Sequence, residues 1–228
     1  MNIELDHVTV SFGERNVIED LSLSLPEKGI VSFFGVSGSG KSTLLNLLAG
    51  LVPLKEGEIR GLEDRRISYV FQEDRLLPWL TVEANVALVG EDSRPVDPQP
   101  FLELVGLGER AKDFPNALSG GMRRRLAIAR ALAYQGDLLL LDEPFSGLDR
   151  GLRQKLMDQL GPMGKDCLLV LVSHDSYECA YLSDRVCMVL PERMVVYETL
   201  TAQGDFSARQ QSPQLVEEME RQIRMLAK

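Results

Sequence analysis

A stretch of small residues near the N-terminus has the spacing of a loop that cradles phosphate. The stretch GVSGSGKST, residues 35–43, fits the pattern G-x-x-x-x-G-K-[ST]. Glycines let the backbone turn so that successive N–H groups point inward, and the N-terminus of a following helix adds partial positive charge. A glycine-rich turn with a solvated lysine is the alternative. The members of the predicted site are Gly35, Val36, Ser37, Gly38, Ser39, Gly40, Lys41, Ser42 and Thr43.

Two residues of this loop and one distant aspartate point to a site for a nucleoside triphosphate and Mg²⁺. Lys41 would bridge the β- and γ-phosphates of ATP, and the Ser42 hydroxyl would bind the metal. Mg²⁺ also calls for a carboxylate, and Asp142 ends the apolar run LLLLD at residues 138–142. Ligands of open α/β sheets bind at the carboxyl ends of the strands, where this carboxylate would lie.

A second carboxylate follows directly. Glu143 is adjacent to Asp142, and neighbouring residues that leave a strand point in different directions. We therefore expect the two carboxylates to have different roles. Asp142 would hold the metal through water, whereas Glu143 would orient or deprotonate the water that attacks the γ-phosphate, with Pro144 restricting the chain.

Another segment also suits an anion. The sequence ALSGGMRRRL, residues 117–126, places Ser119, Gly120 and Gly121 at a predicted helix start, where they could contact a γ-phosphate. A simple helix N-cap would explain the same residues. Three arginines at positions 123–125 follow in the first helical turn, where positive charge opposes the helix dipole. An anionic surface facing this turn would compensate, and a solvated basic face is the alternative.

The elements that must position these residues indicate an α/β fold. Alternation of apolar and polar residues at 3–10 and 21–25 predicts antiparallel strands with one buried face. Nearly continuous apolar runs, separated by helical patterns, predict parallel strands at residues 30–34, 138–142, 167–173 and 185–190. We therefore predict a phosphate-loop NTPase core with a mainly parallel sheet, an N-terminal antiparallel β subdomain and a helical insertion.

A single domain over residues 1–228 is expected from the length. Helical signals dominate about residues 81–133, which we interpret as a helical subdomain inserted into the sheet domain. A terminal packing helix is expected at about residues 213–228. Its apolar face would consist of Leu215, Met219, Ile223 and Leu226.

Composition limits the possible partners. The formal net charge is −9, which disfavours nucleic acid and anionic membrane surfaces as direct partners. No apolar run approaches the roughly 18 residues that span a bilayer, and the opening MNIELDHVTV lacks the features of a signal peptide. The three cysteines form no C-x-x-C pair, which is typical of buried thiols in a reducing compartment. We expect a cytoplasmic protein that reaches a membrane only through a partner.

Five ordered motifs resemble those of the ATP-binding cassette (ABC) family. They are the phosphate loop, LSGGM at 118–122, LLLLDEP at 138–144, SGLD at 146–149 and VSHD at 172–175. The resemblance extends from about residue 12 to residue 190. It implies that two copies pair head to tail, so that each ATP lies between the phosphate loop of one copy and the LSGG segment of the other. The family usually has glutamine at position 124 and often at position 122, where this chain has Arg124 and Met122.

The resemblance implies roles for five further residues. Phe12 would stack on adenine and Val17 would line the same base, whereas an ordinary core phenylalanine is the alternative for Phe12. Gln72 would sense Mg²⁺ or the attacking water, and an exposed polar loop residue is its alternative. His174 would contact the γ-phosphate. Asp149 would cross the dimer interface, and a helix N-cap is its alternative.

The segment RLLPWLTVEANV, residues 75–86, resembles the region that receives the cytoplasmic helix of a membrane partner. Trp79 and Leu80 follow Pro78 and would present apolar area at a rigid bend. The alternative is that both side chains pack within the helical insertion. The amino-acid sequence of this segment resembles that of the corresponding segment in importers for nitrate, sulfonate and taurine.

The resemblance as a whole implies the ATP-binding and ATP-hydrolysing subunit of an importer, peripheral on the inner face of the cell membrane. Its implied partners are a second nucleotide-binding subunit, an integral-membrane permease and, indirectly, a solute-binding protein, with no nucleic acid. One alternative is a soluble ABC ATPase acting on DNA or ribosomes, although such proteins usually carry long coiled coils or a second cassette. A small-molecule phosphoryl transferase is the other, and it would leave the LSGG and SGLD segments without a role.

Overall fold

A six-stranded, mainly parallel sheet forms the centre of the computed structural model, which describes residues 1–91, 94–191 and 194–227. The strand order is β5-β6-β7-β3-β8-β9, and only the β8–β9 pairing is antiparallel. In chain order these strands are β3 (Gly29–Phe34), β5 (Ile67–Val70), β6 (Leu138–Asp142), β7 (Leu168–Ser173), β8 (Arg185–Val189) and β9 (Val196–Thr201). The predicted α/β fold with a mainly parallel sheet is confirmed.

A smaller antiparallel sheet is formed by the N-terminal part of the chain, as predicted. Its strand order is β2-β1-β4, with β1 (Ile3–Phe12), β2 (Arg15–Leu25) and β4 (Glu56–Arg60). The register of β1 against β2 shifts between Leu5 and Val8, and His7 adopts a φ of 50°. This bulge interrupts the alternation of residues 3–10, because an extra residue moves the following side chains to the other face.

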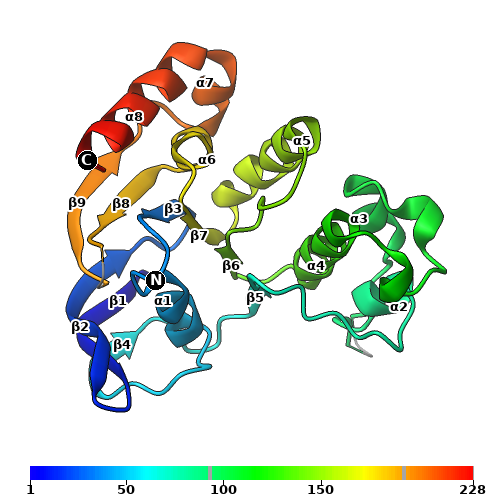
Figure 1. The fold of residues 1–228 in the computed structure, drawn as a ribbon, viewed down its shortest axis with the longest axis horizontal. Coiled ribbons are helices and arrows are strands. Elements are labelled where there is room, and N and C mark those ends of the chain that lie inside the picture. The colour runs from blue at the N-terminus through cyan, green and yellow to red at the C-terminus, as the bar shows by residue number, and fades with distance from the viewer. Residues whose placement is uncertain (92–93, 192–193, 228) are drawn as a thin grey trace.

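Helices cover the sheets and also form a separate lobe. Figure 1 shows the lobe, coloured green, to the side of the strands, and it contains α2, α3 and α4. Three short 3₁₀ helices lie at Gly108–Arg110, Pro115–Ala117 and Gly161–Lys165. The α-helices are α1 (Lys41–Leu48), α2 (Val82–Ala87), α3 (Gln99–Leu104), α4 (Gly120–Tyr134), α5 (Arg150–Leu160), α6 (Ser176–Leu182), α7 (Phe206–Gln211) and α8 (Pro213–Leu226). Of the helices described, none is both long and apolar enough to cross a membrane.

Apolar side chains of the parallel strands alternate between two cores. Along β6, Leu139 and Leu141 join one core with residues of α4 and α6, whereas Leu138 and Leu140 join the other with residues of α1 and β1. All five residues of β6 are buried. A strand that is covered on both faces has no polar side, which explains the continuous apolar run at residues 138–142.

The apolar face of α8 differs slightly from the sequence prediction. Met219 and Ile223 are buried as predicted, but the third buried residue is Val216. Leu226 is exposed, so its predicted place on the packing face is wrong. Leu226 is the last residue of the helix, and it lines a groove together with Phe34 and Tyr197.

Truncating the buried face of α8 should destabilise the fold. Ile223→Ala would leave a cavity in the core, which costs about 2–5 kcal/mol of the free energy of unfolding. Leu226→Ala is the matched control and should change this free energy by less than about 1 kcal/mol, because the side chain is already exposed. Urea denaturation followed by circular dichroism measures both. Equal losses in the two variants would contradict the assigned face.

Candidate active site

Four neighbouring strands bring most of the predicted residues to one edge of the sheet. The phosphate loop follows β3, and Asp142 with Glu143 stand at the end of β6. His174 comes directly after β7, and Gln72 follows β5 by two residues. Since these strands are adjacent and parallel, their carboxyl ends lie together.

The phosphate loop has the backbone shape that phosphate binding requires. Gly38 and Gly40 adopt φ values of 83° and 92°, a region that side chains with a Cβ rarely occupy. Gly40 is also the N-cap of α1, and it supplies no side-chain hydrogen bond to the first turn. No acidic residue lies in this turn, which is wholly within the described chain. The first N–H groups of α1 therefore remain available to an anion.

Lys41 is not a solvated side chain, so that alternative is wrong. Only 5% of the residue is exposed. Its Nζ donates hydrogen bonds to the carbonyl oxygens of Gly35 at 2.9 Å and Val36 at 2.6 Å, and to the Ser39 hydroxyl at 3.0 Å. Burial lowers the pKa of Lys41, and the nearby carboxylates Glu143 and Asp142 oppose this shift.

Asp142 has an unusual buried oxygen. The residue is 4% exposed, and its Oδ1 is the one buried side-chain polar atom of the described residues that lacks a hydrogen-bond partner. Burial raises the pKa of Asp142, and the Ser42 hydroxyl is the largest opposing influence. A buried carboxylate oxygen without a partner is costly unless a cation or a donor satisfies it. Together with the Ser42 hydroxyl it provides the hard oxygen ligands that Mg²⁺ prefers.

Glu143 and His174 form a contact at the sheet edge. His174 Nδ1 lies 3.1 Å from Glu143 Oε1, and the histidine is largely exposed whereas the glutamate is largely buried. Glu143 adopts a φ of 46°, a left-handed conformation that costs a residue other than glycine about 1–3 kcal/mol. Its N–H donates to the carbonyl of Val172 on the neighbouring strand at 2.9 Å. The backbone is therefore held in a conformation that turns the carboxylate toward His174.

Arg124 fits neither interpretation made from the sequence. It is 5% exposed, so it is neither part of a solvated basic face nor directed at an external anionic surface. Instead, its guanidinium donates to five backbone carbonyls, two after β5 and three at or just after the end of β6. The acceptors are Phe71, Gln72, Asp142, Glu143 and Pro144. The positive charge near the start of α4 is thus compensated inside the molecule.

The two flanking arginines also bind backbone carbonyls. Arg123 donates to the Leu118 carbonyl at 2.7 Å, which lies just before the helix. Arg125 donates to Val105 at 2.8 Å and Gly106 at 3.3 Å, in the turn after α3. Both side chains therefore stabilise the helical lobe itself.

The second glycine segment lies beside the SGLD segment. Ser119 caps α4 by accepting a hydrogen bond from the N–H of Met122 at 3.3 Å. A Cβ on Gly121 would lie 3.6 Å from the carbonyl oxygen of Gly147. Asp149 caps α5 by accepting from the N–H of Leu152 at 3.0 Å. Both capping alternatives are thus present, and the roles of these exposed residues toward a neighbouring copy stay predictions.

Three other predicted residues have surroundings that can be compared with their proposed roles. Phe12 is 55% exposed, so the core alternative is wrong and its ring is accessible for stacking. Val17 borders the phosphate loop, since its Cγ1 lies 3.0 Å from where a Cβ on Gly40 would stand. Gln72 is exposed, and its role toward Mg²⁺ or the attacking water stays a prediction.

The bend that carries Trp79 is held by a residue that sequence reasoning missed. Trp79 is 70% exposed, so its packing inside the helical insertion is wrong, whereas Leu80 is half-buried. Asn85 is completely buried and accepts from the Leu77 N–H at 2.9 Å. Its amide also donates to the carbonyls of Leu77, Leu80 and Thr81. An asparagine within the helical pattern was the available signal.

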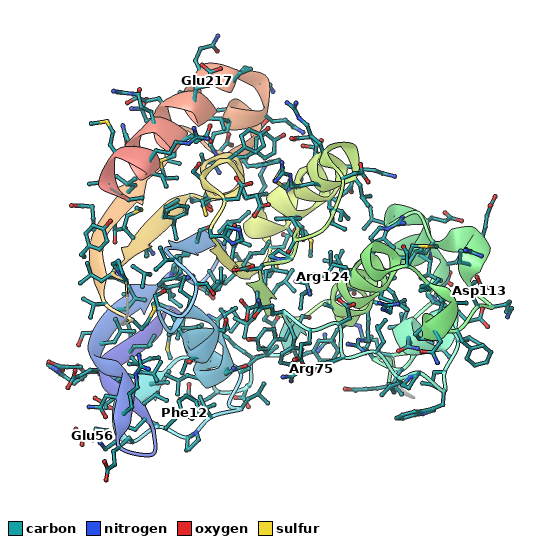
Figure 2. All side chains as sticks on the ribbon, viewed as in Figure 1. Phe12, Glu56, Arg75, Asp113, Arg124 and Glu217 are labelled. Carbon is teal, nitrogen blue, oxygen red and sulfur yellow. The ribbon has the colours of Figure 1, made fainter. Side chains whose placement is uncertain are left out.

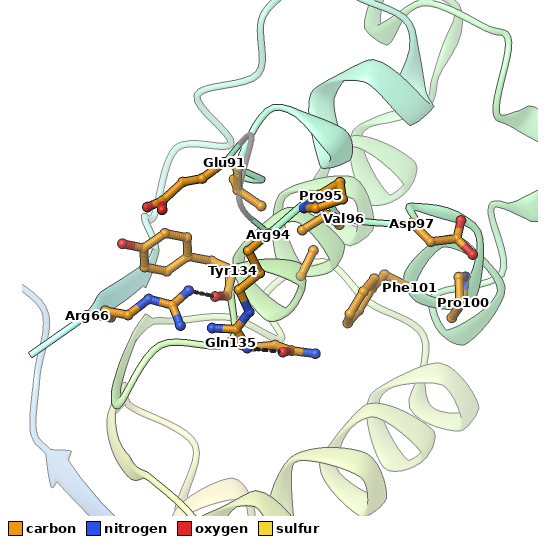
Figure 3. Close-up of a pocket in the computed structure, with 12 residues that line it drawn as sticks. Arg66, Glu91, Arg94, Pro95, Val96, Asp97, Pro100, Phe101, Tyr134 and Gln135 are labelled. Carbon is orange, nitrogen blue, oxygen red and sulfur yellow. Dashed lines mark hydrogen bonds between the residues drawn. The ribbon is translucent and has the colours of Figure 1, made fainter.

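A cavity of about 760 Å³ is lined by Arg66, directly before β5, and by residues of the helical lobe that include the end of α4. Figure 3 shows Arg66 and Arg94 in its wall, each already engaged. Arg66 donates to the Tyr134 carbonyl at 2.5 Å, and Arg94 donates to the Gln135 side chain at 2.8 Å. None of the described lining residues belongs to the predicted site.

Comparison with known proteins finds relatives over most of the chain. A family model described as ABC transporter matches residues 18–146. The aliphatic sulfonates import ATP-binding protein SsuB 1 of Pseudomonas savastanoi is 45% identical over 194 residues, covering 83% of this chain and 80% of the relative. The taurine import ATP-binding protein TauB of Rhizobium johnstonii is 40% identical over 210 residues, covering 83% and 79%. The dimeric cassette MJ0796, solved in a post-hydrolysis state bound to ADP and Pi, has a TM-score of 0.77 at 29% identity and covers 89% of this chain and 99% of its own.

Alanine at two glycines of the phosphate loop should have unequal effects. Gly38→Ala meets only the cost of a left-handed backbone, about 1–2 kcal/mol, because no atom lies within 4 Å of the added Cβ. Gly40→Ala adds contacts of 3.0 Å with Val17 and 3.1 Å with Met194, so it should destabilise the fold further. Denaturant unfolding of both variants measures the difference. A smaller loss for Gly40→Ala would contradict the loop geometry.

Proposed function

Because the chain belongs to the ABC transporter family, we propose that it is the ATP-binding and ATP-hydrolysing subunit of an importer for small sulfonate-like solutes, with aliphatic sulfonates and taurine as the model compounds. One structural observation is the main support for the ATPase role. The phosphate loop, the unsatisfied oxygen of Asp142 and the Glu143–His174 contact meet at the carboxyl edge of one sheet. The names of the relatives support the solute class.

Phosphate binding is assigned to the loop and to Lys41. The N–H groups at the start of α1 donate to phosphate oxygens, and the Lys41 ammonium neutralises the β- and γ-phosphates. Lys41 Nζ must then exchange the loop carbonyls of Gly35 and Val36 for the nucleotide. The loop therefore keeps the lysine buried near its working position before ATP arrives.

Hydrolysis is assigned to the Glu143–His174 contact. Glu143 orients the attacking water and accepts its proton as oxygen bonds to the γ-phosphorus and ADP leaves. His174 is exposed beside that carboxylate, where it can donate a hydrogen bond to the γ-phosphate and fix the position of Glu143. Gln72, on the neighbouring loop, would contact the same water or the metal.

The residues that would hold Mg²⁺ are Ser42, Asp142 and Gln72. The unpartnered Oδ1 of Asp142 supports this assignment, because a cation or its bound water would satisfy that oxygen. When bound, the metal would neutralise charge that develops on the phosphate oxygens. The nearby Ser42 hydroxyl, Arg124 and Lys41 oppose the rise in the pKa of Asp142 that its burial causes.

The second glycine segment, Ser119 to Gly121, is assigned to the nucleotide of a neighbouring copy. Ser119 and Gly120 are exposed at the start of α4, next to the SGLD segment. In a head-to-tail pair they would meet the γ-phosphate that the other copy binds, and Asp149 would lie at the interface. The dimeric state of the similar cassette MJ0796 supports this arrangement. Phe12 and Val17 would contact the adenine at the opposite end of the nucleotide.

The contact with the permease is assigned to the apolar surface beside β5. A groove of about 340 Å³ is lined by apolar side chains that include Leu51, Tyr69 and Phe71. Trp79 stands exposed in the loop that follows. A short amphipathic helix of the permease fits such a groove, and the aromatic residue supplies an anchor. This contact would hold the subunit on the inner face of the cell membrane, with a solute-binding protein acting from the other side.

Two substitutions should separate ATP binding from hydrolysis. Lys41→Ala should abolish ATP binding, because the buried ammonium and its charge are lost. Glu143→Gln should still bind ATP and accumulate as an ATP-bound dimer, while kcat falls by about 100-fold or more. Equilibrium binding of a fluorescent ATP analogue, size-exclusion chromatography and phosphate release measure these outcomes. Fast hydrolysis by Glu143→Gln would remove the assigned base.

Loss of the exposed aromatic anchor should weaken the permease contact. Trp79→Ala should lower the affinity for the permease that co-purifies with the wild-type chain by about tenfold or more. Met225→Ala is the control, because Met225 is 62% exposed on α8, in a different part of the molecule. Surface plasmon resonance with the immobilised permease in detergent measures both Kd values. An unchanged Kd for Trp79→Ala would exclude this surface, and co-sedimentation with ribosomes or DNA instead of a permease would contradict the transport role.

A further inference from the structure

We propose that Arg124 is a positioning residue that holds the backbones of Gln72 and Glu143 in one rigid unit, so that ATP hydrolysis depends on it although it does not touch ATP. The inference rests on the proposed function, because it needs Glu143 as the residue that activates water. Figure 2 shows Arg124 at the junction between the helical lobe and the end of β6. The residue lies on α4, whereas its acceptors lie on the loop after β5, at the last residue of β6 and on the loop that follows β6.

Every donor of the guanidinium is used. An arginine carries five N–H donors in a fixed planar arrangement. Nε donates to the Pro144 carbonyl at 3.2 Å, and Nη2 donates to Asp142 and Glu143 at 2.7 Å each. Nη1 donates to Phe71 and, at 3.3 Å, to Gln72. A planar group that binds two loops at once fixes the distance between them.

The contact with Glu143 bears on catalysis directly. Glu143 holds a left-handed backbone conformation with a φ of 46°, which this residue type does not favour by itself. Its carbonyl accepts from Arg124, and its N–H donates to Val172. These two hydrogen bonds hold both ends of the strained residue. Without the first, the peptide after Glu143 can relax, and the carboxylate moves away from its contact with His174.

The loop after β5 is tied to α4 at a second point. Arg130, six residues further along the helix, donates to the carbonyls of Asp74 and Arg75. Asp74 Oδ1 in turn lies 3.7 Å from Arg124 Nη1, and the pair is mostly buried. The loop that carries Gln72 is therefore attached to α4 at both positions. Only Arg124 continues the connection to the end of β6.

The test compares two substitutions of Arg124 with control substitutions of two other arginines in the 228-residue chain. Arg124→Gln removes the charge and leaves at most two donors, so it cannot bind both loops. We expect its kcat for ATP hydrolysis to fall by about 10- to 100-fold, with the KM for ATP within about threefold of the wild-type value. Arg124→Lys keeps the charge and should give an intermediate kcat, which keeps the test valid if the glutamine variant folds poorly.

Two controls separate positioning from general stability. Arg209 on α7 is also buried and donates to the carbonyls of Tyr181, Leu182 and Gly204, none of which belongs to the proposed site. Arg209→Gln should lower the Tm without lowering kcat at temperatures where the protein is folded. Arg125→Gln removes the same charge one residue away, where the contacts lie inside the helical lobe, and it should keep kcat within about twofold of the wild type.

The outcomes distinguish the inference from the proposed function. A wild-type kcat in Arg124→Gln or in Arg124→Lys would overturn the inference while leaving the ATPase role intact. An equal loss of kcat in Arg209→Gln would overturn it too, because the effect would then be one of stability. A wild-type chain that hydrolyses no ATP, alone or with its permease, would instead remove the proposed function.

Discussion

The order of four adjacent parallel strands is the constraint on which the chemistry of this molecule depends. Because β5, β6, β7 and β3 are neighbours, residues far apart in the chain meet where these strands end. Burial of β6 and β7 on both faces fixes their register, since a shift by one residue would exchange the two cores. The same burial places Asp142 at the sheet edge with an oxygen that the described protein does not satisfy. The sheet thus holds a buried carboxylate oxygen in place without a hydrogen-bond partner among the described residues.

Arg124 adds a second constraint that the sheet alone cannot supply. Loops after adjacent strands can move independently, because only the strands are bound in the ladder. A buried guanidinium is costly in a low-dielectric interior, and this cost is offset only if all of its donors are satisfied. Five carbonyls from two loops meet that requirement together, so moving either loop would leave buried donors without partners. The charge therefore favours a single arrangement of Gln72 and Glu143.

The sequence predicts the strands and loops whose chemistry is local, and it fails where the partners are distant. The phosphate loop and the run at residues 138–142 are readable because their spacing and burial leave a direct pattern. The strands β4 and β9 are largely exposed and β5 has only four residues, so none leaves such a pattern. Arg124 was misinterpreted because its acceptors lie 18–20 and 52–53 residues away. The bend beside Trp79 differs, because Asn85 holds it through local contacts only 4–8 residues away along the chain.

The segment at Ser119 is connected through α4 to the loops that carry Gln72 and Glu143. Ser119 stands at the N-terminus of this helix, and Arg124 lies one and a half turns later on the same rigid element. Under the head-to-tail arrangement proposed above, Ser119 contacts the nucleotide of the neighbour, whereas the loops held by Arg124 serve the copy's own nucleotide. A displacement of α4 by the neighbour's γ-phosphate would therefore also shift the backbone of Glu143 through Arg124. Such a link would make hydrolysis in one half of the dimer depend on occupancy of the other, without any contact between the two nucleotides.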